Sequence, residues 1–249
     1  MHYICYRWYN LICVTFDMQK IFLTTKDGVK IAANLYPAES PKGWIVFSHM
    51  MPVVKESWND LAEMFCGAGY ESVAIDLRGH GESVSAETQK LNYRNFSDAE
   101  HQKSILDLET AAEFLIKERK AAADKVSFVG ASIGANLSLQ YISEHPEFKT
   151  AVLLSPGLDY RGVKTEPLAK NLKAGQKVFF ISAKDDTRSS GNNNAEENQK
   201  LYDLIPDGAE KKIKIYANGG HGTDILGNQP ELAGLIKDFI CQTVLSLKP

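Results

Sequence analysis

The pentapeptide Gly130–Gly134 (GASIG) is the feature that most restricts how this chain can fold. It follows the apolar run 126–129 and leads into the stretch 135–142, so the pattern predicts a strand, a tight turn and a helix. In a G-x-S-x-G turn the serine adopts strained backbone geometry, and side chains at the two glycines would collide with the neighbouring strand and helix. The hydroxyl of Ser132 is therefore expected to point out over the carboxyl edge of a sheet.

Apolar runs alternate with amphipathic stretches along the rest of the chain. The residues 19–23 and 29–36 alternate in polarity around Lys26-Asp27-Gly28, which predicts an antiparallel N-terminal hairpin. Buried strands are expected at 44–47, 70–75, 126–129, 151–154, 178–181 and 212–216. Helices are expected at 58–66, 97–116, 135–142, 167–172, 195–204 and 230–247. This order predicts an α/β fold with a mostly parallel sheet and helices on both faces, which binds ligands at the carboxyl ends of its strands.

The first 17 residues differ from the rest in being apolar and aromatic. Arg7 and Asn10 interrupt this run, which is too short to span a bilayer and has no small-residue cleavage site. We therefore expect no stable membrane insertion. Residues 1–17 are interpreted as an N-terminal extension of undetermined role, followed by one domain over residues 18–249.

Charge and cysteine content exclude several classes of function. A formal charge of −3 and an isoelectric point near 6.1 leave no basic field for nucleic acid. The four cysteines are scattered without metal-ligand spacing, so we expect reduced thiols, no zinc site and a cytoplasmic location. The oligomeric state stays open, with a homodimer as one alternative.

A serine hydroxyl becomes a useful nucleophile only beside a histidine base that a carboxylate orients. In folds with this turn, the order along the chain is serine, acid, histidine. Here Asp185 and Asp186 follow the predicted strand 178–181, and His221 follows the strand that ends at Tyr216. Both loops leave the same edge of the sheet as Ser132, so the three groups can meet there.

With these segments in place, the sequence resembles the α/β-hydrolase-fold serine hydrolases from about residue 19 to its C-terminus. The segments that carry the resemblance are SHMM at 48–51, DLRGHGES at 76–83, GASIGA at 130–135, SAKDD at 182–186 and GGHG at 219–222. Carboxylesterases, lysophospholipase-like proteins and dienelactone-hydrolase-like proteins are the similar groups. The last of these usually has a cysteine nucleophile, which Ser132 does not match.

The resemblance implies a catalytic triad in which Ser132 is the nucleophile and His221 is the general base. Asp186 is the expected acid because it lies three residues after Ala183, and Asp185 is the alternative. The resemblance also implies an oxyanion hole formed by the backbone amides of Ile133 and Met51.

Other polar groups near these motifs are expected to have structural roles. The family usually has glycine where this chain has Met50, which leaves the conformation of the oxyanion loop open. His49 is expected to orient that loop, and Arg78 and His80 to hold the turn at 76–83. No metal or organic cofactor is required for the implied chemistry.

The segment 155–176 has room for one short helix only, so we expect no large cap over the site. Met50, Leu158 and Tyr160 are expected to line an open, apolar pocket, to which Met51 and the 83–96 loop also contribute. The predicted function is hydrolysis of carboxylic or thio esters with small to medium acyl chains, through an acyl-enzyme on Ser132. Two alternatives stay open: a slow-turnover ligand-binding or receptor-like protein of this fold, and an oligopeptidase-like serine peptidase.

Overall fold

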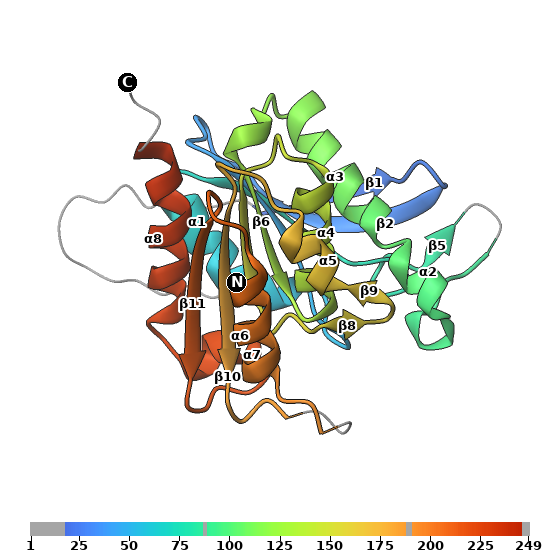
Figure 1. The fold of residues 1–249 in the computed structure, drawn as a ribbon. Coiled ribbons are helices and arrows are strands. Elements are labelled where there is room, and N and C mark those ends of the chain that lie inside the picture. Colours follow the sequence, from blue (N-terminus) through green and yellow to red (C-terminus); the bar gives the residue numbers. More distant parts are fainter. Residues whose placement is uncertain (1–17, 87–88, 188–190, 246–249) are drawn as a thin grey trace.

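The computed structural model describes residues 18–86, 89–187 and 191–245 (Figure 1), so the predicted extension 1–17 lies outside the described residues. A nine-stranded sheet forms its centre in the order β1-β2-β4-β3-β6-β7-β10-β11, with β5 paired to β2. The strands of this sheet are β1 (Gln19–Thr24), β2 (Val29–Tyr36), β3 (Trp44–Ser48), β4 (Glu71–Ile75), β5 (Ser85–Ala86), β6 (Val126–Ala131), β7 (Thr150–Leu154), β10 (Lys177–Ala183) and β11 (Glu210–Tyr216). A separate hairpin consists of β8 (Asp159–Tyr160) and β9 (Val163–Lys164).

The pairing of the strands confirms the predicted sheet. Every neighbouring pair from β4 to β11 is parallel, whereas β1–β2 and β2–β4 are antiparallel. The hairpin turn between β1 and β2 is closed by Thr25, whose Oγ1 accepts from the Val29 amide at 2.9 Å. Gly28 in that turn has φ 79°, a conformation that favours glycine. The central strands are buried on both faces, which explains their continuous apolar sequences.

Helices cover both faces of the sheet (Figure 1). The α-helices are α1 (Asn59–Gly67), α2 (Asp98–Gln102), α3 (Ile105–Lys117), α4 (Ile133–Glu144), α5 (Thr165–Lys170), α6 (Asn194–Leu204), α7 (Asp224–Asn228) and α8 (Leu232–Leu245). Short 3-10 turns are η1 (Lys55–Trp58), η2 (Tyr93–Asn95) and η3 (Ala123–Lys125). Apolar residues of α3, α4, α5 and α6 pack on one face in the larger core cluster, and those of α1, α7 and α8 pack on the other. The sheet therefore separates two hydrophobic cores.

Two local differences from the sequence-based expectation concern helices. The helix expected over 97–116 is divided into α2 and α3, because i→i+3 hydrogen bonds at Lys103 and Ser104 form a tight turn there. The start of α2 has the expected capping box, in which Ser97 and Glu100 bond reciprocally to each other's amides. Between β7 and β10 the chain forms only the β8–β9 hairpin and α5, so the predicted absence of a large cap is correct.

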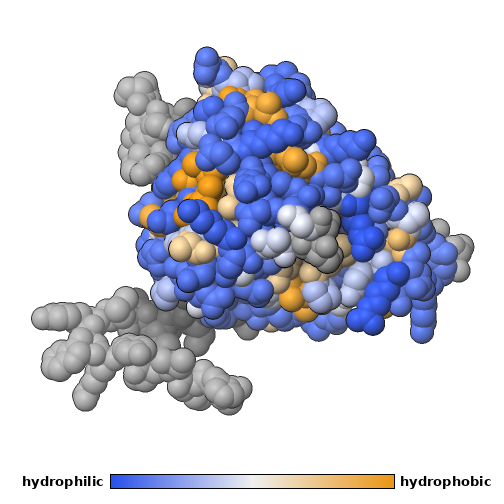
Figure 2. Space-filling model, turned by 60° about the horizontal axis from the view of Figure 1, so that its bottom comes forward, coloured by the Kyte–Doolittle hydropathy of each residue, from blue (hydrophilic) through white to orange (hydrophobic). Residues whose placement is uncertain are grey.

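No helix in the described part of the chain is both long enough and apolar enough to cross a membrane. Figure 2 turns the lower edge of Figure 1 forward and shows a mostly hydrophilic face, on which hydrophobic residues form small separate groups.

Candidate active site

The turn at Ser132 joins β6 directly to α4. Ser132 has φ 53° and ψ −119°, so a non-glycine residue occupies the strained conformation that the motif predicts. Its amide donates to the Leu154 carbonyl of β7 at 2.8 Å, and its carbonyl accepts from Ala135 and Asn136 of α4. These hydrogen bonds hold the turn from both sides, and its side chain stands at the N-terminus of α4.

The two glycines of the turn are required by close packing. A Cβ on Gly130 would lie 2.2 Å from the Gly134 carbonyl oxygen, and a Cβ on Gly134 would lie 2.3 Å from the carbonyl oxygen of Ser48. Both distances are far below any normal contact. Ser48 Oγ donates to the Gly134 carbonyl at 3.0 Å, so the first turn of α4 is bonded to the end of β3. The loop after β3 and the turn at Ser132 are therefore one packed unit.

His221 pairs with Asp186 and not with Asp185. The Nδ1 atom of His221 lies 2.7 Å from Oδ2 of Asp186, whose side chain is only 7% exposed, while the imidazole keeps 28% exposure. Asp185 instead accepts from the backbone amides of Gly219 and Gly220, each at 3.1 Å. The two adjacent carboxylates thus contact the loop that carries His221 at different points: Asp186 contacts the ring and Asp185 contacts the backbone.

The histidine loop, residues 217–222, packs against the turn at Ser132. A Cβ on Gly222 would lie 3.4 Å from Cβ of Ala131 and 2.5 Å from Sδ of Met50. Gly222, which follows His221, therefore lies against Ala131, which precedes Ser132. Among the described residues, no hydrogen bond joins Ser132 to the imidazole. Such bonds are often long without substrate and tighten when it binds.

Two backbone amides at the carboxyl edge of the sheet, those of Ile133 and Met51, are available to bind an anion. Ile133 is the first residue of α4, and no acceptor among the described residues engages its amide or that of Met51. The N-terminus of a helix also carries partial positive charge. A developing oxyanion would be stabilised by such amides if both point to it.

His49 fixes the loop after β3 as a neutral ring. Its Nε2 accepts from the Leu77 amide at 3.0 Å, so Nδ1 carries the proton and donates to the Met50 carbonyl at 2.8 Å. Complete burial lowers the pKa of His49 to about 4. The ring therefore joins Met50 to the turn that follows β4, in agreement with its expected orienting role.

The predicted pocket residues lie in different surroundings. Met50 is buried against the histidine loop, and Met51 packs against the larger core cluster. The Tyr160 ring meets the His221 ring edge-on, with centroids 6.2 Å apart. Leu158 lines a cavity of about 240 Å³ beside α6 together with Asn192, Asn193, Glu196, Glu197 and Lys200. The structure brings Met50 and Tyr160 to the histidine loop, whereas Leu158 faces α6.

Asn136 of α4 holds the segment that carries Tyr160. Its side-chain amide donates to the carbonyls of Gly157 and Val163 and accepts from the Gly157 amide. Thr165 adds a bond from its hydroxyl to the Gly157 carbonyl at 2.7 Å. The β8–β9 hairpin is therefore fixed to α4, the same helix that begins at Ser132.

The turn at 76–83 has charged residues that are used in packing. Arg78 donates to the buried Asp107 and makes a two-point contact with Asp27 at 2.7 and 3.0 Å. The Nζ of the buried Lys55, a residue that no sequence motif singled out, bonds Asp76 and Glu82. Each of these contacts joins the turn to another element, so the expected structural role of Arg78 fits its surroundings.

His80 in the same turn also has structural contacts. It stacks on Tyr93 with ring centroids 3.8 Å apart, and its Nδ1 lies 3.2 Å from the Arg78 carbonyl. Burial lowers the pKa of His80 to about 3, so the ring is neutral at pH 7. Its environment resembles that of His49 rather than that of His221.

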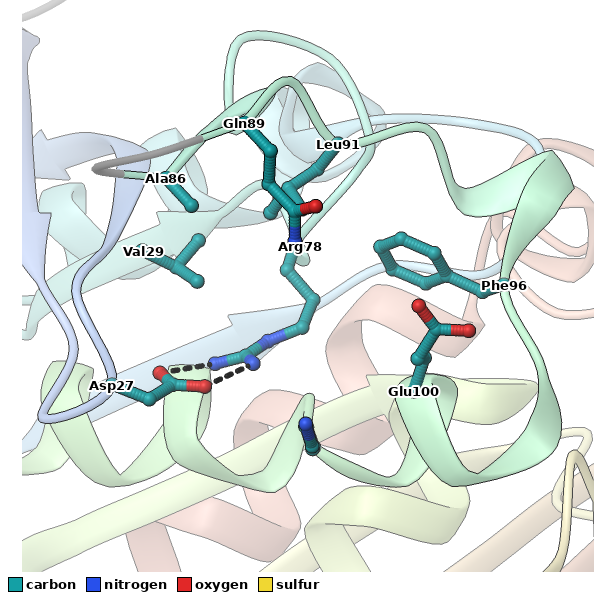
Figure 3. Close-up of a pocket in the computed structure, with 9 residues that line it drawn as sticks. Asp27, Val29, Arg78, Ala86, Gln89, Leu91, Phe96 and Glu100 are labelled. Atoms are coloured by element: carbon teal, nitrogen blue, oxygen red, sulfur yellow. Dashed lines mark hydrogen bonds and ion pairs between the residues drawn. The ribbon is translucent and has the colours of Figure 1, made fainter.

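A cavity of about 280 Å³ lies beside Arg78, bounded by the described part of the 83–96 loop, α2 and the β1–β2 turn (Figure 3). In Figure 3 the Arg78 guanidinium points to Asp27, with Phe96 and Glu100 on the other side of the cavity. None of the predicted catalytic residues is among the described residues that line it.

Comparison with known proteins identifies the type of enzyme. Residues 39–203 match the family model described as serine aminopeptidase, S33. The Pyrococcus furiosus esterase Pf2001 has a similar structure, with a TM-score of 0.74, 17% identity and coverage of 92% of each chain. Acetyl xylan esterase 1 from Thermoanaerobacterium sp. has a TM-score of 0.72 and 18% identity, and covers 94% of this chain and 86% of its own. At these identities the two structures show a common fold.

A curated relative is more similar in sequence over a shorter region. The non-heme chloroperoxidase CPO-A1 of Kitasatospora aureofaciens is 29% identical over 134 residues, which cover 53% of this chain and 42% of that protein. The chain spans about half the length of the curated relatives it matches. The match therefore supports the common fold and leaves the substrate open.

Proposed function

Because the chain belongs to the serine aminopeptidase, S33 family of α/β hydrolases, we propose that it cleaves carboxylic or thio esters through an acyl-enzyme on Ser132. The observation that carries this proposal is the 2.7 Å contact between His221 and Asp186, in a loop packed against the strained turn at Ser132. A carboxylate on one ring nitrogen orients the imidazole and makes the other nitrogen a proton acceptor.

The proposed reaction has two acyl-transfer steps. His221 accepts the proton of Ser132 while Oγ attacks the carbonyl carbon, and the oxyanion is bound by the amides of Ile133 and Met51. The imidazolium gives this proton to the leaving alcohol or thiol as its bond to the acyl carbon breaks. A water then loses a proton to His221 and attacks the acyl-enzyme, and Ser132 regains a proton as the acid leaves. Asp186 stabilises the imidazolium in both steps.

The surroundings of the site favour acyl groups of small to medium size. Tyr160 presents ring surface beside the histidine loop, which packs on the buried Met50, and the only insertion between β7 and β10 is a short hairpin with one helix. Without a cap, a long chain would gain little enclosed apolar contact. We therefore expect activity to be highest on short and medium acyl esters.

The family description makes aminopeptidase activity the second candidate. A peptide N-terminus would need a carboxylate beside the scissile bond to bind its ammonium group. The two carboxylates that hydrogen-bond to the histidine loop are engaged, Asp186 by the ring and Asp185 by two backbone amides. Ester cleavage requires no such group, so the esterase proposal fits these contacts better.

The test is a chain-length series of p-nitrophenyl esters, acetate to palmitate, with amino-acid p-nitroanilides assayed in parallel. We expect turnover of the acetate to octanoate esters by the wild type and a loss of at least about 1,000-fold in Ser132→Ala. Absence of any Ser132-dependent ester turnover would refute the proposal, and preference for the anilides would favour the aminopeptidase.

A further inference from the structure

The histidine loop has little regular structure to hold it in place. Gly220 and Gly222, on either side of His221, have φ angles of 77° and 58°, so the backbone reverses direction around the imidazole. Glycines at such positions permit many conformations in addition to the observed one. Two amides at the start of α7 bond the carbonyls of His221 and Gly222, and side chains from other elements bond the amides of the loop.

Asp185 holds the N-terminal side of this loop. Its Oδ2 accepts from the Gly219 amide and its Oδ1 from the Gly220 amide, both at 3.1 Å. The contact uses both oxygens and joins residues 34 and 35 positions apart in sequence. Because Asp185 directly precedes Asp186, the backbone contact and the imidazole contact come from one turn after β10.

Ser155 holds the C-terminal side. Its Oγ accepts from the Gly222 amide at 2.9 Å, in a completely buried position. Ser155 also has φ 50°, a strained value for a non-glycine residue, and its amide donates to Ile181 of β10 at 2.8 Å. The strained backbone is thus anchored in the sheet, and it directs the hydroxyl toward the histidine loop.

We propose that Asp185 and Ser155 form a two-point clamp on the histidine loop and act as positioning residues for His221 in ester hydrolysis. The proposal rests on the proposed function for its kinetic part, and on the loop geometry for the clamp itself. Asp185 fixes Gly219 and Gly220, Ser155 fixes Gly222, and His221 lies between them. Neither residue touches the substrate; both act by keeping the imidazole on Asp186 and beside the turn at Ser132.

Asp224 provides a matched control for the charge of Asp185. It is an exposed carboxylate on the same loop side, with its Cβ 3.3 Å from where a Cβ of Gly220 would stand. It accepts no hydrogen bond from the Gly219 or Gly220 amides. Asp224→Asn therefore removes one negative charge near His221 and leaves the clamp intact.

The kinetic experiment compares Asp185→Ala, Asp185→Asn, Ser155→Ala and Asp224→Asn on a short-chain p-nitrophenyl ester. We expect Asp185→Ala and Ser155→Ala to lower kcat about 10- to 100-fold with KM changed less than twofold, since a misplaced catalytic group costs rate rather than binding. Asp185→Asn, which keeps one acceptor oxygen, should lose less than Asp185→Ala. Asp224→Asn should stay within twofold of the wild type. A rise in KM at constant kcat would overturn the positioning role.

A double-mutant cycle tests whether Asp185 acts through the imidazole. In an Asp186→Asn background, Asp185→Ala should lower kcat less than threefold, because the orientation that it protects is already lost. A full 10-fold or larger effect in that background would contradict the clamp.

Amide hydrogen exchange measured by NMR on the full chain tests the clamp without reference to activity. Asp185→Ala should speed exchange at Gly219 and Gly220 at least about 10-fold, and Ser155→Ala should do the same at Gly222, while Asp224→Asn changes neither. Unchanged exchange in both clamp variants overturns the inference. If the wild type shows no Ser132-dependent turnover, the proposed function fails and the exchange rates alone decide whether the clamp exists.

Discussion

The histidine loop and the turn at 76–83 both bring a nitrogen-containing side chain against carboxylates at the same edge of the sheet, and they use the contact differently. Arg78 is 4% exposed and bonds two carboxylates, Asp27 and Asp107. The imidazole of His221 is 28% exposed and bonds one, Asp186. Its Nε2 has no hydrogen-bond partner in the part of the chain that the structure describes. The guanidinium of Arg78 stays protonated and joins elements of the fold through its donors, whereas an imidazole with one nitrogen open can accept and release a proton.

The turn at 76–83 also shows how burial changes the effect of one guanidinium. The hydrogen bond from Arg78 lowers the pKa of Asp27 to about 2, because it outweighs the desolvation of this side chain, which keeps 34% exposure. The same residue contacts Asp107, yet complete burial raises the pKa of Asp107 to about 6. The same guanidinium thus accompanies a lowered pKa at a partly exposed carboxyl and a raised pKa at a buried one, so contact with a cation does not by itself determine the direction of the shift.

The largest expected effect comes from removing the carboxylate that contacts His221. Asp186→Asn should lower kcat about 1,000- to 10,000-fold on a p-nitrophenyl ester, because an amide stabilises neither the required tautomer nor the imidazolium. The melting temperature should stay within a few degrees of the wild type. Asp185→Asn is the isosteric comparison on the neighbouring residue. Should Asp185→Asn lower kcat about 1,000-fold or more while Asp186→Asn lowers it less than about 10-fold, the acid has been assigned to the wrong carboxylate.

A second substitution removes the ion pairs of Arg78 in the turn at 76–83. Arg78→Met should destabilise the protein by about 3–5 kcal/mol, because it leaves the carboxylate of Asp107 buried without its partner. The remaining folded protein should retain ester turnover within several-fold, since Arg78 does not contact the histidine loop. Urea denaturation measures the stability and active-site titration corrects the rate. A stable variant with a 1,000-fold lower kcat would place Arg78 among the catalytic groups.

The smallest effect concerns two neutral histidines, one in the loop after β3 and one in the turn at 76–83. His49 and His80 have folded-state pKa values of about 4 and about 3, below the ordinary 6.5 of an unfolded histidine. The unfolded chain therefore binds more protons below pH 6.5, and stability falls as the pH drops from about 6.5 toward 4. For His49 the loss is on the order of 3 kcal/mol.

Asp107 acts in the opposite direction, since its pKa of about 6 lies above that of an unfolded aspartate, and the folded state gains stability as it is protonated. Two histidines outweigh one carboxyl, so we expect net destabilisation between pH 6.5 and 4. Denaturant titrations across this range measure it, and His80→Gln should flatten the pH dependence. An identical slope in wild type and variant would show that His80 does not carry the effect.

Much of the fold was predictable because it depends on local patterns. Continuous apolar runs identified the buried strands, and the polarity change around Gly28 identified the N-terminal hairpin. The division of α2 from α3 was missed. The capping box at Ser97 is followed by apolar residues at helical spacing, which predicts one continuous helix, and the turn at Lys103 has no strong sequence signal. The roles of Lys55 and Ser155 were missed for a similar reason: their partners are far away in the sequence.

The sequence by itself determined the turn at Ser132, since its two glycines are needed wherever strand and helix pack this closely, and it determined the order of serine, acid and histidine. Only the tertiary structure decided which of two adjacent aspartates meets the imidazole and what the other does. The physical reason is that steric demands at glycine act within a few residues. The direction of a carboxylate in a loop is set by hydrogen bonds to backbone 34 or 35 residues away, which no local pattern records.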